Sequence, residues 1–235
     1  MKARKVKKLD PAAPLAENAA RIVRVRMDEL RSFAPGAVEK GKVKAQHDMR
    51  IAAKRLRYVL EATEMCFGEP GERARKRARE LQDVLGELHD CDVMQPRVRE
   101  HLEQIRADDL NAIQRQAGAA DDLDPDLIGQ APNSAAYPGL ESLTLYLDAR
   151  RDLLFDRFRE QWQIDADHGT WDRLRRVADE ILERAEQRRD VIKRADRARK
   201  ELEQAKRAEQ EAIEDAQRAA SELAEARRAA QADSD

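Results

Sequence analysis

The C-terminal part of this chain contains none of the residues that interrupt a helix. Glycine and proline are absent from residues 171–235, where alanine, glutamate and arginine are abundant, and this composition strongly favours a helix. Apolar residues recur in this segment at alternating intervals of four and three residues, which is the heptad spacing of a coiled coil. The seam consists mainly of alanine; its positions are Val191, Ala195, Ala198, Leu202, Ala205, Glu209, Ala212, Ala216, Ala219, Leu223, Ala226 and Ala230. We therefore expect a long C-terminal helix within residues 166–235.

The partner of this seam is left open by the sequence. Alanine is small and buries little surface, so pairing within the chain, self-association and partial fraying are all compatible with the pattern. We expect self-association as a homodimer, with the seam or an exposed face of the preceding helices as the interface.

The preceding residues predict shorter helices separated by turns. Charged residues make up 39% and aromatic residues only 4% of the chain, which favours helices with solvated faces over a β-sandwich or barrel. Residues 118–139 contain several Asp, Pro and Gly residues and are expected to form a loop. The fold class is thus all-α, with a flexible basic arm at residues 1–14 and a helical bundle at 15–165. The expected helices are Leu15–Phe33, Val43–Phe67, Glu72–Leu88, a fourth that is capped by Asp90 or Asp92 and ends near Asp109, and Leu140–Ile164.

The chain has no sequence signal for secretion or membrane insertion. Its first residues, MKARKVKKLD, are basic and lack the apolar core of a signal peptide, and no apolar run approaches the ~20 residues of a membrane span. Cys66 and Cys91 are the only cysteines and lack the spacing of a zinc site. We expect a cytoplasmic protein without a cofactor or a bound metal.

The segment HDMRIAAKRLRYVLEA, which starts at His47, combines a helix pattern with a one-sided distribution of charge. At 100° per residue, Lys54 falls within about 20° of His47, and Arg50, Arg55 and Arg57 fall within about 80°. Apolar residues occupy the opposite side, which is expected to pack against the core. The cations therefore form a basic stripe roughly 15 Å long, with no carboxylate of the segment between them.

A charged helix face is usually a solvated surface on which acidic and basic residues alternate at i and i+4. Here like charges repel each other by roughly a few tenths of a kcal/mol per pair, which favours an anion-binding site over a plain surface. Arginines also flank or interrupt the apolar faces of three other predicted helices, which suggests a bundle that opens into a basic groove. They are Arg26, Arg77, Arg150 and Arg151, each of which alone is compatible with an ion-paired or snorkelling side chain.

These motifs resemble one known family. HDMRIAAKRLRYVLEA, followed by LQDVLGELHDCDV from Leu81 to Val93, is similar to the pattern of the CHAD family, the conserved histidine α-helical domain, and ARR at 149–151 fits the same pattern. The resemblance covers roughly residues 15–165. It implies an all-helical bundle, usually with two related halves, that binds inorganic polyphosphate in a basic cavity and is associated with polyphosphate granules. It also implies ligand roles for His47, Arg50, Lys54, Arg55 and Arg57.

We therefore predict a non-enzymatic protein that binds inorganic polyphosphate through the stripe, with Arg26, Arg77, Arg150 and Arg151 as further ligand candidates. A full-length member of the family would be expected to have two copies of the basic motif, whereas this chain contains one. The site is then either completed by a second subunit or belongs to a shortened bundle. Association with polyphosphate granules would follow from the same binding.

Other activities have less support in the sequence. Catalytic signatures such as HExxH and GxxxxGK[ST] are absent, and the run His89-Asp90-Cys91-Asp92 is interpreted as a helix cap with a satisfied polar histidine rather than a metal site. A nucleic acid is the main rival ligand, because clustered cations bind any phosphate chain, but few aromatic residues are present to stack on bases. An acidic protein partner bound by a scaffold that assembles through a coiled coil is the third alternative.

Overall fold

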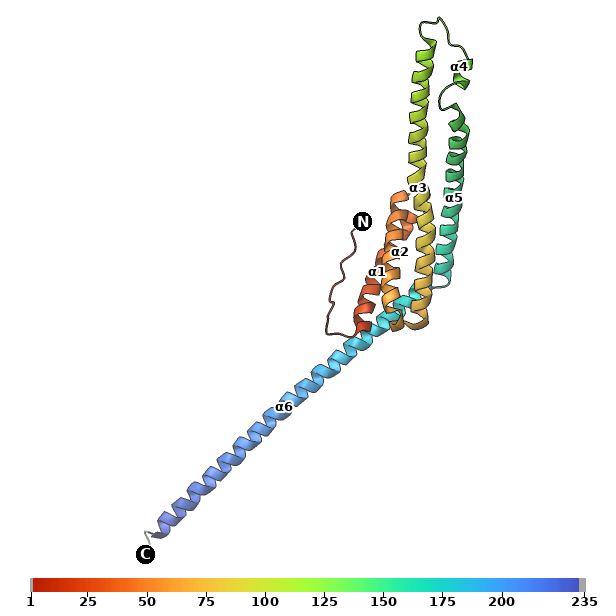
Figure 1. The fold of residues 1–235 in the computed structure, drawn as a ribbon. Helices are drawn as coiled ribbons and strands as arrows, with labels where there is room; N and C mark the ends of the chain where they lie inside the picture. The colour runs from red at the N-terminus through yellow and green to blue at the C-terminus, as the bar shows by residue number, and fades with distance from the viewer. Residues whose placement is uncertain (1, 233–235) are drawn as a thin grey trace. The chain divides into compact units, whose positions relative to one another are not determined.

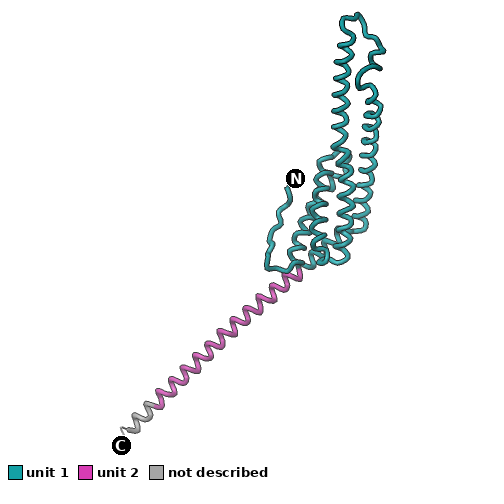
Figure 2. The backbone as a smooth tube through the Cα atoms, in the orientation of Figure 1, with its two compact units in different colours: residues 1–182 teal, residues 183–235 magenta. Residues whose placement is uncertain are grey.

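The computed structural model describes the backbone of residues 2–232 and the side chains of residues 2–224. It divides the chain into two compact units, Met1–Leu182 and Glu183–Asp235 (Figure 2). The predicted all-α class is confirmed, since helices and turns account for the regular structure of residues 2–232 and no strand occurs among them. None of the helices in this range is long and apolar enough to cross a membrane.

The first unit is a bundle in which helices that follow one another in sequence also pack side by side. Contacts join α1 to α2, α2 to α3, and α3 to α5 (Figure 1). The first turns of α6 also belong to this unit, because Trp171, Leu174 and Ala178 are buried in the same core. The elements are α1 (Leu15–Ala37), α2 (Val43–Thr63), the 3-10 turn η1 (Glu64–Cys66), α3 (Gly68–Ala117), α4 (Asp126–Gly129), η2 (Ser134–Ala136), α5 (Tyr137–Asp167) and α6 (Thr170–Ala232).

The core explains why these helices approach closely. Small residues such as Ala52 and Ala53 on α2 are fully buried beside Leu56 and Leu60, so neighbouring backbones can come close while the leucines fill the space between them. Each fully buried leucine contributes about 2 kcal/mol of hydrophobic stabilisation. The predicted apolar face of the basic helix is thus buried, and its orientation fixes which face of α2 remains available at the surface.

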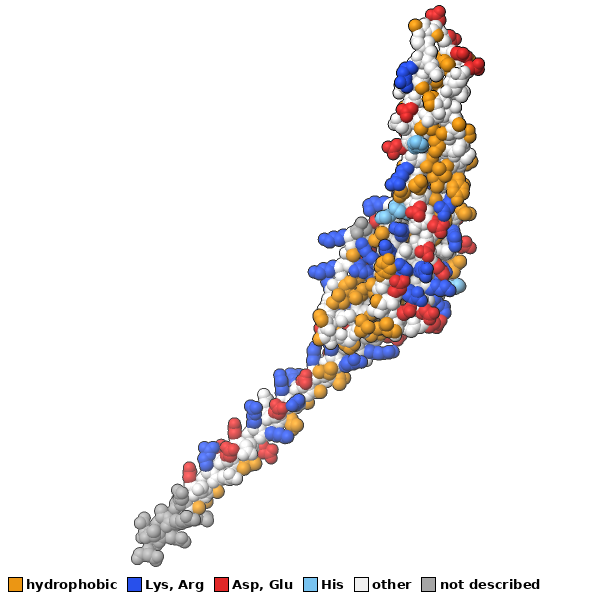
Figure 3. Space-filling view, in the orientation of Figure 1, with side chains coloured by type: hydrophobic (Ala, Val, Ile, Leu, Met, Phe, Trp, Pro, Cys, Tyr) orange, Lys and Arg blue, Asp and Glu red, His pale blue; other side chains and the backbone are white. Residues whose placement is uncertain are grey.

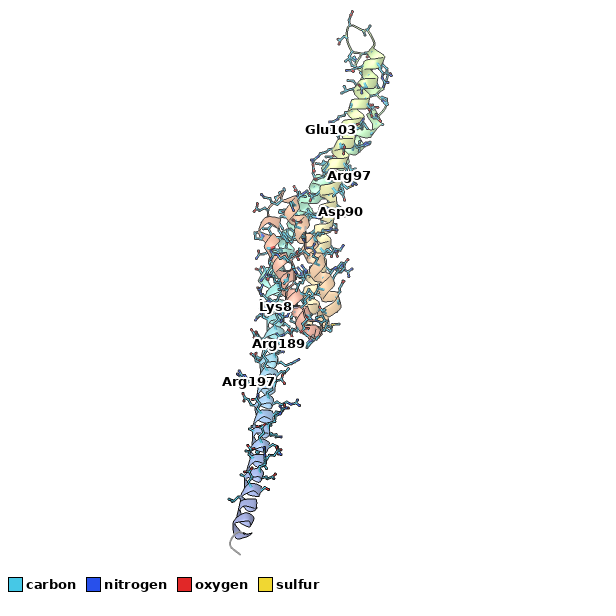
Figure 4. The ribbon with its side chains drawn as sticks, turned by 90° about the vertical axis from the view of Figure 1, so that its left-hand side faces the viewer. Lys8, Asp90, Arg97, Glu103, Arg189 and Arg197 are labelled. Carbon is cyan, nitrogen blue, oxygen red and sulfur yellow. The ribbon has the colours of Figure 1, made fainter. Side chains whose placement is uncertain are left out.

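The predicted third and fourth helices are a single helix, so the expected break at Asp90 or Asp92 is wrong. α3 runs without interruption from Gly68 to Ala117 and passes through Pro96; Asp90, Arg97 and Glu103 mark its course in Figure 4. Asp92 does not cap a helix, because its carboxylate accepts a hydrogen bond from Arg151 of α5. Because Arg151 binds this carboxylate, Asp92 does not compete for the backbone hydrogen bonds of α3.

Other helix ends differ from the sequence expectation by a few residues. α1 continues through Pro35 to Ala37, because a proline close to a helix end removes few intrahelical bonds. α2 ends at Thr63 and is followed by η1, and α5 starts three residues earlier than expected, at Tyr137. The expected loop of residues 118–139 contains the short helices α4 and η2.

The N-terminal segment lies against α1 without forming a helix. The backbone N–H of Arg4 donates to the Glu29 carboxylate at 3.3 Å, and Asn18 donates to the carbonyl of Asp10 at 2.7 Å. The segment therefore runs antiparallel to α1. Its flexibility, and the expected domain boundaries at residues 14 and 165, stay predictions; Met1 lies outside the described residues.

The second unit consists of the continuation of α6. The predicted long C-terminal helix is confirmed up to Ala232, and all side chains from residue 186 to residue 224 are exposed. The apolar positions of the seam therefore have no partner among the described residues. The seam positions Ala226 and Ala230 lie outside the residues whose side chains the structure describes, as do residues 233–235, and pairing through the seam stays a prediction.

Candidate functional site

The basic stripe lies on the face of α2 that points away from the core. Met49 and Leu56 on the opposite face are 0% exposed. Lys54 is exposed, whereas His47 and Arg50 are half-buried beside α3. The separation of charge predicted for this helix is therefore present, and the part nearest to His47 is sheltered by the neighbouring helix.

Three contacts define the register between α2 and α3. The imidazole rings of His47 and His89 lie 4.5 Å apart between centroids. At the next position, a Cβ atom on Gly86 would lie 3.5 Å from Nε of Arg50. Further along, Nε of Arg57 donates to the side-chain oxygen of Gln82 at 3.1 Å. Residues 82, 86 and 89 of α3 thus face the stripe of α2, and none of them carries a carboxylate.

Arg50 and Lys54 form no ion pair with any residue that the structure describes. The buried Nε of Arg50 also has no hydrogen-bond partner, and the same holds for Nδ1 of His47 and Nδ1 of His89. Lys54 lies 5.7 Å from the ring centroid of Tyr58, a weak cation–π contact. A buried N–H without a partner is costly in a folded protein. These three nitrogen atoms have almost no solvent-accessible surface, so an external acceptor reaches them only after the side chains move.

Two arginines of the predicted site share one buried carboxylate instead. Glu29 of α1 is 1% exposed and accepts hydrogen bonds from Arg26 and Arg55, each at 2.7 Å. The sequence expectation of a stripe without a nearby carboxylate therefore needs correction at Arg55, because α1 brings Glu29 to it. Arg57 also has a carboxylate partner, Glu61, at 3.0 Å on its own helix.

The remaining arginines proposed from the sequence join α3 to α5 through ion pairs. Arg77 donates to Asp165 at 2.6 Å, and Arg150 donates to Glu87 at 2.7 Å. Arg151 is buried and donates to Asp92 at 2.6 Å and to Gln46 of α2 at 3.1 Å. Their ligand roles stay predictions. Each of these side chains already joins two helices through an ion pair, so an anion would compete with the carboxylate partner for it.

Titratable groups near the stripe respond to its burial and its charge. Burial lowers the pKa of His47, and the nearby His89 and Arg50 lower it further, whereas Asp48 opposes these effects. Burial raises the pKa of the Cys91 thiol, and Arg150, whose guanidinium lies 3.9 Å from that sulfur, partly opposes the increase. The free imidazole of His47 therefore favours its neutral form near neutral pH.

His89 was misassigned by the sequence argument. We expected a satisfied polar residue near a helix cap, but His89 lies inside α3 and its buried Nδ1 has no partner. The spacing of Gln82, Gly86 and His89 at intervals of four and three residues could have indicated a common helix face. The sequence could not indicate that this face meets the stripe, since that depends on the α2–α3 register. Glu29 was missed for the same reason.

Two other features bear on the chemistry of the molecule. No group of three or more His, Cys, Asp or Glu residues suited to a metal ion occurs among the described residues. A hollow of about 730 Å³ lies between α1 and α5, away from the stripe. It is lined by four apolar residues, Ala34, Pro35, Val38 and Trp162, and by five charged or polar residues. Figure 3 shows Lys and Arg side chains gathered beside the N-terminal segment, and a band of hydrophobic side chains along α3 and α5.

Comparison with known proteins gives one match. Residues 2–99 match the family model described as CHAD domain. This range includes the N-terminal segment and α2 but ends within α3, so it is narrower than the expected 15–165 on the C-terminal side and excludes Arg150 and Arg151. No curated protein and no solved structure matches the chain.

Proposed function

We propose that this chain, which belongs to the CHAD family through residues 2–99, binds inorganic polyphosphate along the stripe of α2 and does not convert it. The CHAD domain is associated with polyphosphate binding in general. The observation that carries the proposal is that His47, Arg50 and Lys54 lie on one face of α2, and that neither Arg50 nor Lys54 has a carboxylate partner among the described residues.

The electrostatic argument concerns what remains after internal pairing. Most arginines in the first unit are bound to carboxylates, so their charges are largely neutralised at short range. Arg50 and Lys54 keep their full charge, and Arg50 is partly desolvated by α3, which strengthens its interaction with an anion. An Arg offers paired donors in a fixed fork, while a Lys acts as a point charge, and both suit phosphoryl oxygens.

A polymeric anion fits this row better than a single phosphate. From His47 to Lys54 the helix rises about 10 Å, so one small anion cannot contact both ends of the row. A flexible chain of phosphoryl groups can follow the row from one end to the other. Long polyphosphate should therefore bind more tightly than orthophosphate at equal phosphate concentration.

The test is calorimetric titration of the full chain with long-chain polyphosphate, orthophosphate and single-stranded RNA at matched salt. Replacing both Arg50 and Lys54 by Ala should weaken polyphosphate binding by at least about tenfold, or ~1.4 kcal/mol. The matched control replaces Lys193 and Arg197 by Ala, which removes the same two residue types at the same spacing from exposed positions of α6. That control should retain the wild-type affinity.

Four results would contradict the proposal. Equal weakening in both double variants would mean that only total charge matters, and unchanged affinity in Arg50→Ala/Lys54→Ala would remove α2 from the site. Tighter binding of RNA than of polyphosphate would favour the nucleic-acid alternative. Release of orthophosphate from polyphosphate by the purified chain would contradict the non-enzymatic role.

The same proposal includes a homodimer and a cytoplasmic, granule-associated location. On α5, Leu145, Tyr146 and Leu153 are 71%, 59% and 70% exposed, and the seam of α6 is exposed as well. Either apolar surface would be covered if two copies associate. A second copy would also supply a second basic helix, which this chain lacks in its own sequence.

A further inference from the structure

We infer that the exposed part of α6, residues 186–224, binds the same part of α6 in a second copy of this chain, and that the two helices run antiparallel. The inference rests on the homodimer that is part of the proposed function. It goes further, because it chooses between the two exposed apolar surfaces and specifies the orientation and the register of the two helices.

This part of α6 is a long helix without a packing partner among the described residues. All of its side chains are exposed, and it is about 57 Å long at the usual helical rise. Its seam includes the large apolar residues Val191, Leu202 and Leu223, each of which is more than half exposed. Helices in proteins gain most of their stability from the packing of an apolar face. The seam is therefore the surface of α6 on which a partner is expected to bind.

One charged residue of the seam opposes a parallel pair. In a parallel coiled coil, residues with the same number face each other across the seam. Glu209 occupies a seam position and forms no ion pair with any described residue. Two Glu209 carboxylates would then meet between the helices, where like charges without a partner are strongly unfavourable.

An antiparallel pair gives Glu209 a favourable environment instead. When Glu209 faces Ala205 of the second copy, it also lies next to Lys206 of that copy, which follows Ala205 at the edge of the seam. A carboxylate and an ammonium group then replace two facing carboxylates.

The same register aligns the other layers of the seam. Leu202 then faces Ala212 of the second copy, and Leu223 faces Val191. A large residue opposite a small one keeps the two helices at a similar distance along the seam, and the fourth large side chain of each pair of ends is covered by another apolar residue. The apolar residues that α6 exposes on its seam are thus buried in the pair.

The charges beside the seam favour the same orientation, since charged residues at the flanking heptad positions determine the orientation of coiled coils. Three cations flank the N-terminal half of the seam: Arg194, Arg199 and Lys206. Two carboxylates, Asp215 and Glu222, flank its C-terminal half. Antiparallel pairing brings the basic half of one copy to the acidic half of the other, and it places Arg194 near Glu222.

Glu201 is the exception to this distribution, because it flanks the N-terminal half and would lie near Asp215 of the second copy. Both carboxylates already have a cation on their own helix. Arg197 lies 3.7 Å from Glu201, and Arg218 lies 2.8 Å from Asp215. These pairs reduce the repulsion between the two carboxylates, so the charges as a whole still fit a second, antiparallel copy.

The test is disulfide mapping of the full chain. Ala195→Cys and Ala219→Cys are made as separate variants, because positions 195 and 219 face each other only in the antiparallel register. Neither variant alone should form a cross-linked dimer on oxidation. Co-expression of the two variants should give a dimer band on a non-reducing gel, since a disulfide needs the two Cα atoms within about 7 Å of each other.

Two controls measure the background. Lys200→Cys co-expressed with Glu214→Cys places two thiols at corresponding heights of the antiparallel pair, but on the side of each helix that points away from the seam. This combination should not cross-link. Wild type, which contains only Cys66 and Cys91, is oxidised in the same way and should remain without cross-links.

Replacement of Glu209 by Leu tests the reason for the orientation. A parallel pair then has no facing carboxylates and gains a layer of leucines. Ala195→Cys should therefore cross-link with itself when Glu209→Leu is added to the same chain. Absence of that cross-link would contradict the role of Glu209 in setting the orientation.

The outcomes separate this inference from the proposed function. Self-cross-linking of Ala195→Cys in the chain that retains Glu209 would mean a parallel pair, and a wild-type dimer without the mixed cross-link would move the interface to α5; either result would overturn the inference. A monomeric wild type in analytical ultracentrifugation would contradict both the homodimer and the inference. Polyphosphate binding is tested independently by the titrations of Arg50→Ala/Lys54→Ala.

Discussion

Replacement of Glu29 by Gln should lower the stability of the first unit and raise its affinity for polyphosphate. Glu29 is 1% exposed and accepts hydrogen bonds from Arg26 and Arg55 at 2.7 Å each and from the backbone N–H of Arg4 at 3.3 Å. The substitution keeps the shape of the side chain but removes its charge. It therefore leaves two sheltered guanidinium groups without the carboxylate that they share.

The cost can be worked out from the burial of the three partners. The side chains of Arg26 and Arg55 are 13% and 25% exposed, so the pairs are neither fully buried nor freely solvated. Breaking a fully buried pair costs about 3–5 kcal/mol, and the partial exposure of the arginines reduces this to about 3 kcal/mol. For a folded unit of this size the melting temperature should fall by roughly 10 °C.

Urea unfolding and scanning calorimetry would measure the loss, with Glu69→Gln as the control. Glu69 also pairs with an arginine, Arg73, but its side chain is 74% exposed, and exposed pairs contribute about 1 kcal/mol or less. Equal stabilities of the Glu29 and Glu69 variants would refute the argument, because they would mean that the Glu29 network carries no more energy than a surface ion pair.

The effect on binding has the opposite sign. Removal of one negative charge beside Arg55 leaves its guanidinium more available to a polyanion, and the positive field of the stripe increases. Polyphosphate affinity in Glu29→Gln should rise by about threefold to tenfold, or ~0.7–1.4 kcal/mol. An unchanged affinity would show that Arg26 and Arg55 belong to the structure and not to the ligand site.

Three further perturbations test other parts of the description. Gly86→Ala should raise the free energy of unfolding by roughly 0.5–1 kcal/mol, because alanine is the better helix former. Gly86→Leu should weaken polyphosphate binding, because the larger side chain crowds Arg50. Equal polyphosphate affinity of the leucine variant and wild type would contradict this expectation. The pKa of His47 is lowered in the folded state, so the unfolded chain binds more protons just below pH 6.5. The free energy of unfolding should therefore fall as pH falls through this range. In His47→Gln, the free energy of unfolding measured with urea should depend less on pH. A chain that ends at Arg188 should be monomeric by light scattering if the seam joins two copies, whereas an unchanged dimer would move the interface to the apolar face of α5.

The sequence was sufficient to predict the helices and the faces that they bury. In α2, the alternation of apolar and basic residues with the helical period requires that Met49, Leu56 and Leu60 lie on one side and the cations on the other, since 100° per residue is fixed by the backbone. The absence of glycine and proline after Thr170 likewise determined a long helix. These are local properties, and local rules are enough to obtain them.

Local rules failed where a distant residue changes the environment. The predicted break near Asp90 did not occur, because Arg151 binds Asp92 from another helix, and the stripe lost part of its unpaired charge because Glu29 reaches Arg55 from α1. Such pairs join residues 59 and 26 positions apart, and their meeting depends on the register of packed helices.

Tertiary structure alone therefore decided which cations remain without a partner. Arg50 lies beside Gly86 of α3 rather than beside a carboxylate, and Lys54 is exposed. In contrast, Arg77, Arg150 and Arg151 meet acidic residues across α3 and α5. The sequence placed nine candidates on helix faces by periodicity. Helix packing determined which of them are ion-paired. An ion pair needs its two groups within a few ångströms of each other, and periodicity along one helix does not determine that distance.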